Sequence, residues 1–185
     1  LLLFTVLILT ANCFAQKPQY ETGEIKIAAA TAGEPIRKTL SISAARDYLA
    51  NGSQAWTEER KCVSCHTNGT FMQLAPSFGT LFNNQIESHR NFFLSEAAYL
   101  KKTATPSIKE GLQPTQLAYI ANGLATYDAT KNKLTVETKE TLDLMLTAQS
   151  EDGSYNNLDC WPPFESSSYH GANIAAMALA IAPDY

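Results

Sequence analysis

After Leu40 the chain is a succession of stretches in which apolar side chains recur every three or four residues. This spacing places the apolar side chains on one face of an α-helix. Residues that end helices, such as Asn51-Gly52 and Pro183, separate or close the stretches. The pattern therefore predicts a mainly α-helical domain over residues 40–185.

Capping residues set the expected helix boundaries. Ser41 is a good N-cap for a first helix that ends at Asn51-Gly52, and Thr135 is expected to cap a later one. Pro114 fits the first turn of another helix. We expect helices over about 41–50, 87–102, 114–124, 135–146 and 170–181, with residues 70–82 broken at Pro76 and Gly79.

Two segments share one order of features, in which a helix is followed by a glutamine, an aromatic residue and a cysteine. This order indicates an internal helix–loop–helix repeat, with the glutamine and the aromatic residue in the loop. The residues are Tyr48-Leu49, Gln54-Ala55-Trp56 and Cys62 in the first segment, and Met145-Leu146, Gln149, Tyr155 and Cys160 in the second.

Residues 149–155 read Q-x-x-x-G-x-Y, which is similar to Q-x-x-x-G-x-W with Tyr155 in place of tryptophan. The segment resembles the QW repeat of the squalene-hopene cyclase and prenyltransferase superfamily, with a looser second copy near Trp56. The resemblance implies helical-hairpin repeats of an α/α toroid over roughly residues 40–185. A closed ring needs more hairpins than this length holds, so we expect a partial ring or a fragment.

The same resemblance raises the hypothesis of a terpenoid-acting enzyme. Triterpene cyclases protonate their substrate with a D-x-D-D motif, whereas the aspartates of this chain are scattered without such a cluster. The sequence also lacks a Gly-rich phosphate loop and a serine-nucleophile elbow. The absence of a D-x-D-D cluster disfavours the cyclase hypothesis.

Residues 62–66 carry the most specific chemical signature of the chain. Cys62-Val63-Ser64-Cys65-His66 reads C-x-x-C-H, the attachment motif of c-type haem. Each thiol can form a thioether to a haem vinyl group, and His66 then ligates the iron as the proximal ligand. The motif predicts a covalent haem c and a role in electron transfer or haem-assisted redox chemistry. The whole pattern resembles bacterial exported proteins that join this motif to a squalene-cyclase-like helical domain.

The sixth iron ligand has three candidates, Met72, His89 and His170. A methionine ligand would raise the reduction potential and suit electron transfer, whereas an open position would suit ligand binding or peroxide chemistry. Each residue also has a simpler interpretation that involves no metal. Met72 would fill a gap in the core, and His89 would be an exposed residue near the start of a helix.

The same residues also fit a zinc site or a disulfide. If the two similar segments are adjacent, Cys62, Cys65, Cys160 and His170 supply a Cys₃His set for tetrahedral zinc. Alternatively, Cys62 and Cys65 could form a small disulfide. Either case would make the protein a stabilised helical scaffold or binding protein without redox activity. Glu165 could also pair with His170 as an acid and a base.

Residues 1–15 predict export. Residues 1–11 form a near-continuous apolar run that suits the hydrophobic region of a signal peptide, and Cys13 and Ala15 are small residues suited to cleavage before Gln16. No initiator methionine or basic region precedes the run, so we expect an N-terminally truncated signal peptide. The mature protein would be periplasmic or secreted, and it would reach a membrane only if lipidated at Cys13, where Asn12 is a poor lipobox residue.

The charge and composition of the chain limit the kinds of partner that it is expected to bind. The formal net charge is −4 and no run is rich in lysine or arginine, so nucleic acid is not an expected partner. The sequence does not specify the redox partner. We expect residues 16–39 to be a linker in which residues 24–30 can form a short strand.

Overall fold

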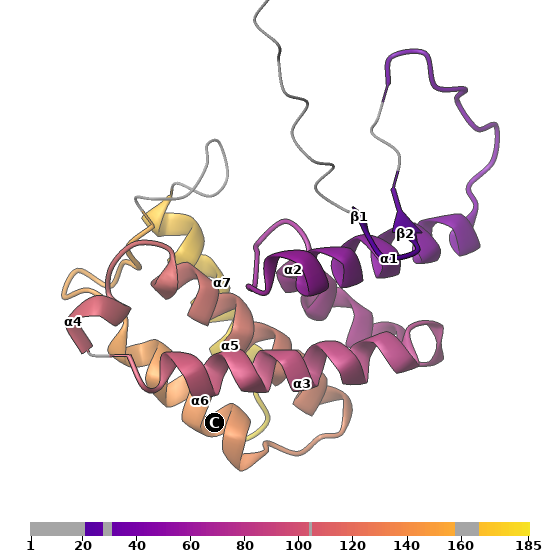
Figure 1. The fold of residues 1–185 in the computed structure, drawn as a ribbon. Coiled ribbons are helices and arrows are strands. Elements are labelled where there is room, and N and C mark those ends of the chain that lie inside the picture. The colour runs from indigo at the N-terminus through magenta and orange to yellow at the C-terminus, as the bar shows by residue number, and fades with distance from the viewer. Residues whose placement is uncertain (1–20, 28–30, 104, 158–166) are drawn as a thin grey trace, which may run out of the picture.

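The computed structural model describes residues 21–27, 31–103, 105–157 and 167–185 and is mainly helical, as predicted (Figure 1). The predicted signal peptide with Cys13, and the loop residues Cys160 and Glu165, lie outside the described residues. The elements are β1 (Glu21–Thr22), β2 (Ile25–Lys26), α1 (Ile42–Arg60), α2 (Asn68–Leu74), the 3₁₀ helix η1 (Ala75–Leu81), α3 (Asn83–Leu100), α4 (Thr105–Ile108), α5 (Gln113–Thr130), α6 (Val136–Thr147) and α7 (Ser168–Ile181).

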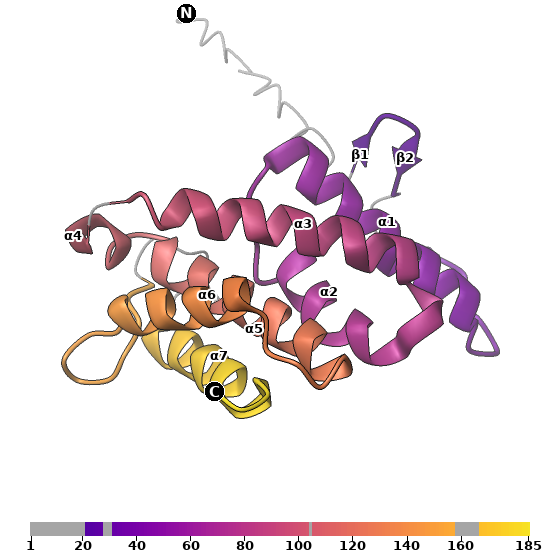
Figure 2. The same cartoon turned by 90° about the horizontal axis from the view of Figure 1, so that it is seen from below.

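Helix α5 lies at the centre of the molecule, with α2, α3, α6 and α7 packed around it (Figures 1 and 2). Its sequence carries one charged residue, Asp128, and most of its side chains are buried. The carboxylate of Asp128 is buried because it accepts hydrogen bonds from the backbone N–H of Thr135, at 2.6 Å, and from the Thr135 hydroxyl, at 2.8 Å. The single charged residue of α5 therefore stabilises the start of α6 through two hydrogen bonds to Thr135.

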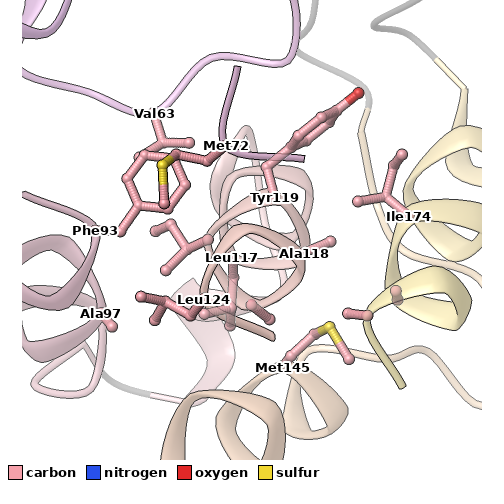
Figure 3. Close-up of a cluster of buried hydrophobic side chains, with 14 of the residues drawn as sticks. Val63, Met72, Phe93, Ala97, Leu117, Ala118, Tyr119, Leu124, Met145 and Ile174 are labelled. Atoms are coloured by element: carbon pink, nitrogen blue, oxygen red, sulfur yellow. The ribbon is translucent and has the colours of Figure 1, made fainter. Parts of the chain in front are cut away.

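The core between α5 and its neighbours is packed without spare room. A Cβ placed on Gly123 of α5 would lie 2.7 Å from the Phe93 ring and 2.8 Å from Cβ of Met72. Figure 3 shows Met72 and Phe93 side by side above Leu124, in one cluster with Val63. The absence of a side chain at Gly123 is thus what allows α2 and α3 to approach α5 so closely.

The first helix is longer than predicted. It was expected to end at Asn51-Gly52, but α1 continues to Arg60 and ends at Lys61, which adopts the left-handed conformation with φ of 51°. Gly52 lies inside α1, where Ile27 comes so close that a Cβ on the glycine would lie 3.3 Å from Cδ1 of Ile27. The helix continues through this residue despite its low helix propensity. As a correction, Gln54 and Trp56 lie in a helix and not in a loop, and the two similar segments are not structurally equivalent.

Several boundary predictions are confirmed. Ser41 and Thr135 cap α1 and α6 through their hydroxyls, and Pro114 lies in the first turn of α5. The stretch 70–82 breaks as expected, because α2 ends at Leu74 and η1 contains Gly79 with φ of 54°. Helix α3 starts at residue 83, earlier than predicted, which places its first turns against α1.

The expected linker contains a small hairpin. β1 and β2 pair antiparallel, with Thr22 opposite Ile25, and β1 packs against α1. In the part of the chain that the structure describes, no helix is both long and apolar enough to cross a membrane.

Replacing Gly123 with alanine tests the packing around α5. We expect Gly123→Ala to lower the free energy of unfolding by about 1–3 kcal/mol, because the new methyl group would overlap Phe93 and Met72. Gly33→Ala is the matched control, since a Cβ at Gly33 meets nothing within 4 Å. Urea denaturation of both variants measures the difference, and equal stability would contradict the close packing.

Candidate functional site

The C-x-x-C-H residues lie in the short connection between α1 and α2. Lys61 ends α1 by donating its backbone N–H to the Thr57 carbonyl at 3.1 Å, and its left-handed conformation turns the chain. Helix α2 then starts at Asn68. The motif therefore occupies a tight corner that is fixed at both ends by helices.

Asn68 holds this corner together and was not singled out from the sequence. Its side chain is fully buried, and its carbonyl oxygen accepts the backbone N–H of Ser64 at 2.8 Å. Its amide nitrogen donates to the Cys62 carbonyl and to the Thr57 hydroxyl, both at 3.0 Å. The indole N–H of Trp56 donates to the same Cys62 carbonyl at 3.2 Å. The one available signal in the sequence is a short amide residue just after the motif, at the start of a helix.

Gly69 sets how closely the corner approaches α5. A Cβ at this position would lie 2.5 Å from the Ser64 carbonyl oxygen and 2.7 Å from the Tyr119 ring. The Tyr119 hydroxyl turns away from the apolar cluster (Figure 3) and lies 2.8 Å from Nε2 of His170. The backbone after the motif therefore rests on Tyr119, and His170 lies at the hydroxyl end of this tyrosine.

The two thiols of the motif have different surroundings. Burial is the largest effect and raises the pKa of Cys62; the hydrogen bond with Trp56 opposes it, and Glu96 and Arg60 make smaller contributions that raise and lower this pKa, respectively. Cys65 is partly buried against the hydrophobic core, with its sulfur 3.8 Å from Nδ1 of His66. Within the described ranges, these two cysteines are thiols and not a disulfide.

His66 is the residue of the motif that reaches a cavity. Its ring packs edge-on against Trp56, with the ring centroids 4.9 Å apart. The Ser64 hydroxyl lies 2.9 Å from Nδ1 and so orients the imidazole. A metal ligand whose other nitrogen is held in this way is directed through Nε2.

The cavity has a volume of about 260 Å³ and lies between α1 on one side and α2 with η1 on the other. Its wall is mainly apolar and contains no carboxylate, lysine or arginine among the described residues. The residues that line it are Ile27, Tyr48, Leu49, Gly52, Ser53, His66, Thr67, Thr70, Phe71, Leu74, Ala75, Phe78 and Phe82.

Large apolar side chains at the mouth of this cavity are open to solvent. Tyr48 is 58% exposed, Leu74 is 53% exposed and Phe78 is 59% exposed. A soluble domain rarely leaves such side chains contiguous and uncovered unless a ligand or partner binds there. Of the two cysteines and the histidine of the motif, His66 lines the cavity, whereas Cys62 and Cys65 do not.

His89 lies directly behind the cavity wall. It is 2% exposed, which contradicts the simple expectation of a solvent-exposed residue, because its ring packs against Ser53 of α1 and Phe71 of α2. Its Nδ1 donates to the Gln85 carbonyl at 2.7 Å, so its Nε2 accepts from the hydroxyl of the cavity-lining Ser53 at 2.5 Å. Burial lowers the pKa of His89 despite these two hydrogen bonds.

Met72 faces away from the cavity. Phe71, Leu74 and Ala75 line it at helical spacing, which leaves the next residue after Phe71 on another face of α2. The Met72 side chain is fully buried beside Phe93, so it fills the core as the simpler interpretation proposed.

The zinc set cannot be assembled from the described residues. Cys160 lies outside them, as does Glu165, and in the ranges described no group of three metal-binding side chains comes together. Of the expected set, the structure places Cys62 and Cys65 in the α1–α2 corner and His170 beside Tyr119.

The Q-x-x-x-G-x-Y segment forms a tight loop after α6. The Gln149 side chain donates to the Gly153 carbonyl at 2.9 Å, and Gly153 adopts φ of 84°. Tyr155 is almost fully buried, with Gly171 of α7 against it. The glutamine therefore holds the loop in its turn, and the tyrosine packs this loop against the start of α7.

Comparisons with known proteins return no relative. No family model matches the chain, and neither the curated proteins nor the solved structures include a significant match.

Replacing Asn68 tests its hold on the corner. We expect Asn68→Ala to lower the free energy of unfolding by about 2–3 kcal/mol, because the Ser64 N–H and the Thr57 hydroxyl would lose their partner. Asn91→Ala is the matched control, since Asn91 is exposed within α3. Chemical denaturation followed by circular dichroism compares the two, and a neutral Asn68 variant would refute this role.

The lowered pKa of His89 makes the stability of the chain without cofactor depend on pH. A histidine in the unfolded state titrates at about 6.5, so below this pH the unfolded chain binds a proton that folded His89 takes up only at lower pH. We expect the free energy of unfolding to hold its value above this range and to fall as the pH is lowered through it. In the His89→Gln variant, the free energy of unfolding should depend less on pH over this range. An unchanged pH dependence would show that His89 is not the group responsible.

Proposed function

We propose that the protein is an exported c-type haem protein. The observation that carries the proposal is that His66, the ligand residue of the C-x-x-C-H motif, lines a half-open apolar cavity whose large side chains are exposed. A flat apolar macrocycle bound there would cover these side chains. Burial of apolar surface contributes about 25 cal/mol per Å², so this coverage would stabilise the complex.

The described residues fit this group in three respects. Both motif cysteines are present as thiols, which thioether formation requires. The wall of the cavity is uncharged and aromatic, which suits a porphyrin ring. Ser64 fixes the orientation of His66 through Nδ1 and directs Nε2 towards a metal.

Each residue of the proposed haem site would have its own role. Cys62 and Cys65 would hold the macrocycle, and His66 would ligate its metal. Asn68 and Trp56 keep the carbonyl of Cys62, and hence the corner, in place. A bound haem c would supply reversible one-electron chemistry.

A toroid-like origin of the scaffold also belongs to this proposal. α5 packs more extensively against α7 than against α6, its neighbour in the chain, so alternate helices lie side by side. Alternate packing of this kind is what helical-hairpin repeats would give, and Tyr155 in the loop after α6 packs against Gly171 of α7. The signal peptide over residues 1–15 and the periplasmic or secreted location remain part of the proposal, as does an unidentified redox partner.

Expression in a bacterial host with haem-attachment machinery tests the function. We expect a reduced pyridine haemochrome band that stays with the protein after acid–acetone extraction. Cys62→Ala should shift this band to the position of a single thioether, because one vinyl group is then unsaturated. Loss of both thiols in Cys62→Ala/Cys65→Ala should abolish covalent haem.

Cys160→Ala is the matched control, because it removes a cysteine outside the motif. The haem proposal predicts an unchanged haem band for this variant. Protein without covalent haem, but with stoichiometric zinc that Cys160→Ala removes, would overturn the proposal in favour of the Cys₃His scaffold.

A further inference from the structure

We propose that His89 is the sixth ligand of the haem iron, on the opposite side from His66. This inference rests on the proposed haem function and specifies its chemistry, since two imidazole ligands leave no open position on the iron. Three features of the described residues support it: the place of His89, the hydrogen bonds that set the tautomer of its ring, and the alternative acceptor available to the hydroxyl in front of it.

Two lining residues, Ser53 and Phe71, connect His89 to the cavity that His66 lines. His66 lines it directly, and His89 is separated from it by Ser53, whose hydroxyl lies 2.5 Å from Nε2 of His89. Phe71 lines the same cavity and packs on the His89 ring, with centroids 4.9 Å apart. A macrocycle that enters the cavity beside His66 therefore approaches the wall that covers His89.

The ring of His89 is already in the form that binds a metal. Its Nδ1 proton is donated to the Gln85 carbonyl, so Nε2 carries a lone pair that points at Ser53. A backbone carbonyl bonded to the other nitrogen is the usual partner of a metal-bound histidine, because it fixes the tautomer and the orientation of the ring. Nδ1 can keep this bond when Nε2 changes partner.

Ser53 can release Nε2 without losing its own hydrogen bond. A serine within a helix can donate its hydroxyl to the carbonyl four residues earlier, which for Ser53 is that of Leu49. Thr57 makes a bond of this kind in the same helix, to the Ser53 carbonyl at 2.9 Å. Rotation of one side chain thus exchanges one hydrogen bond for another and uncovers the lone pair.

The other two candidates are less well placed. Met72 lies in the core on a different face of α2, and it does not line the cavity. His170 has its Nε2 bonded to the hydroxyl of Tyr119, on the side of the motif that faces α5. Two imidazole ligands give a lower potential than a histidine and a methionine would, so the site suits an electron carrier of low potential.

The test uses the full chain with covalent haem attached. Near-infrared magnetic circular dichroism and electron paramagnetic resonance of the oxidised protein should show a low-spin iron with two histidine ligands. The chain has three histidines, so apart from His66 only His89 and His170 can give this signature. His170→Gln should therefore retain it, and this control does not depend on removing a buried residue.

His89→Ala should convert the iron to a high-spin form, and added imidazole should restore the low-spin spectrum. Met72→Leu, which conserves volume, and Ser53→Ala should both leave the low-spin signature intact. A methionine–histidine signature, a high-spin unmodified protein, or loss of the signature in His170→Gln would overturn the assignment while leaving covalent haem in place. Absence of covalent haem would instead overturn the proposed function itself.

Discussion

The burial of α5 on nearly all sides is the constraint on which the rest of the structure depends. Because this helix carries a single charge, it can be surrounded by α2, α3, α6 and α7, and each of these helices finds its apolar face covered by the same partner. Small residues control the separations. Gly123 allows the α2 and α3 side chains to meet α5, and Gly69 brings the start of α2 onto Tyr119.

The position of the candidate site follows from this packing. Met72 packs one face of α2 against α5. Because of this contact, the face of α2 with Phe71 and Leu74, followed by Ala75, points towards α1. α1 and α2 then enclose the cavity that His66 lines. His89 reaches the same region from α3, because that helix crosses α1 near Ser53. A single central contact thus determines which residues of three helices meet.

The sequence allowed the helical class and most helix starts to be predicted, because Ser41, Thr135 and Pro114 act through local capping and backbone geometry. It misplaced the end of α1, because the low helix propensity of Gly52 indicates a helix end, whereas α1 continues through this residue to Arg60 in the packed structure, with Ile27 close to Gly52. The motif residues could be named from spacing alone. The role of Asn68 and the burial of His89 could not, since both depend on contacts that exist only after the helices are packed.

The bonds of Asn68 have a consequence for the order of events in folding. Its three partners lie only 4, 6 and 11 positions away along the chain. Contacts over such short separations cost little loop-closure entropy and can form rapidly. The corner with its two thiols and its histidine can therefore take shape at the scale of two adjacent helices, before α5 has joined the core. At that stage the cysteines would already have their relative orientation while still open to solvent, which would suit the haem attachment that we propose.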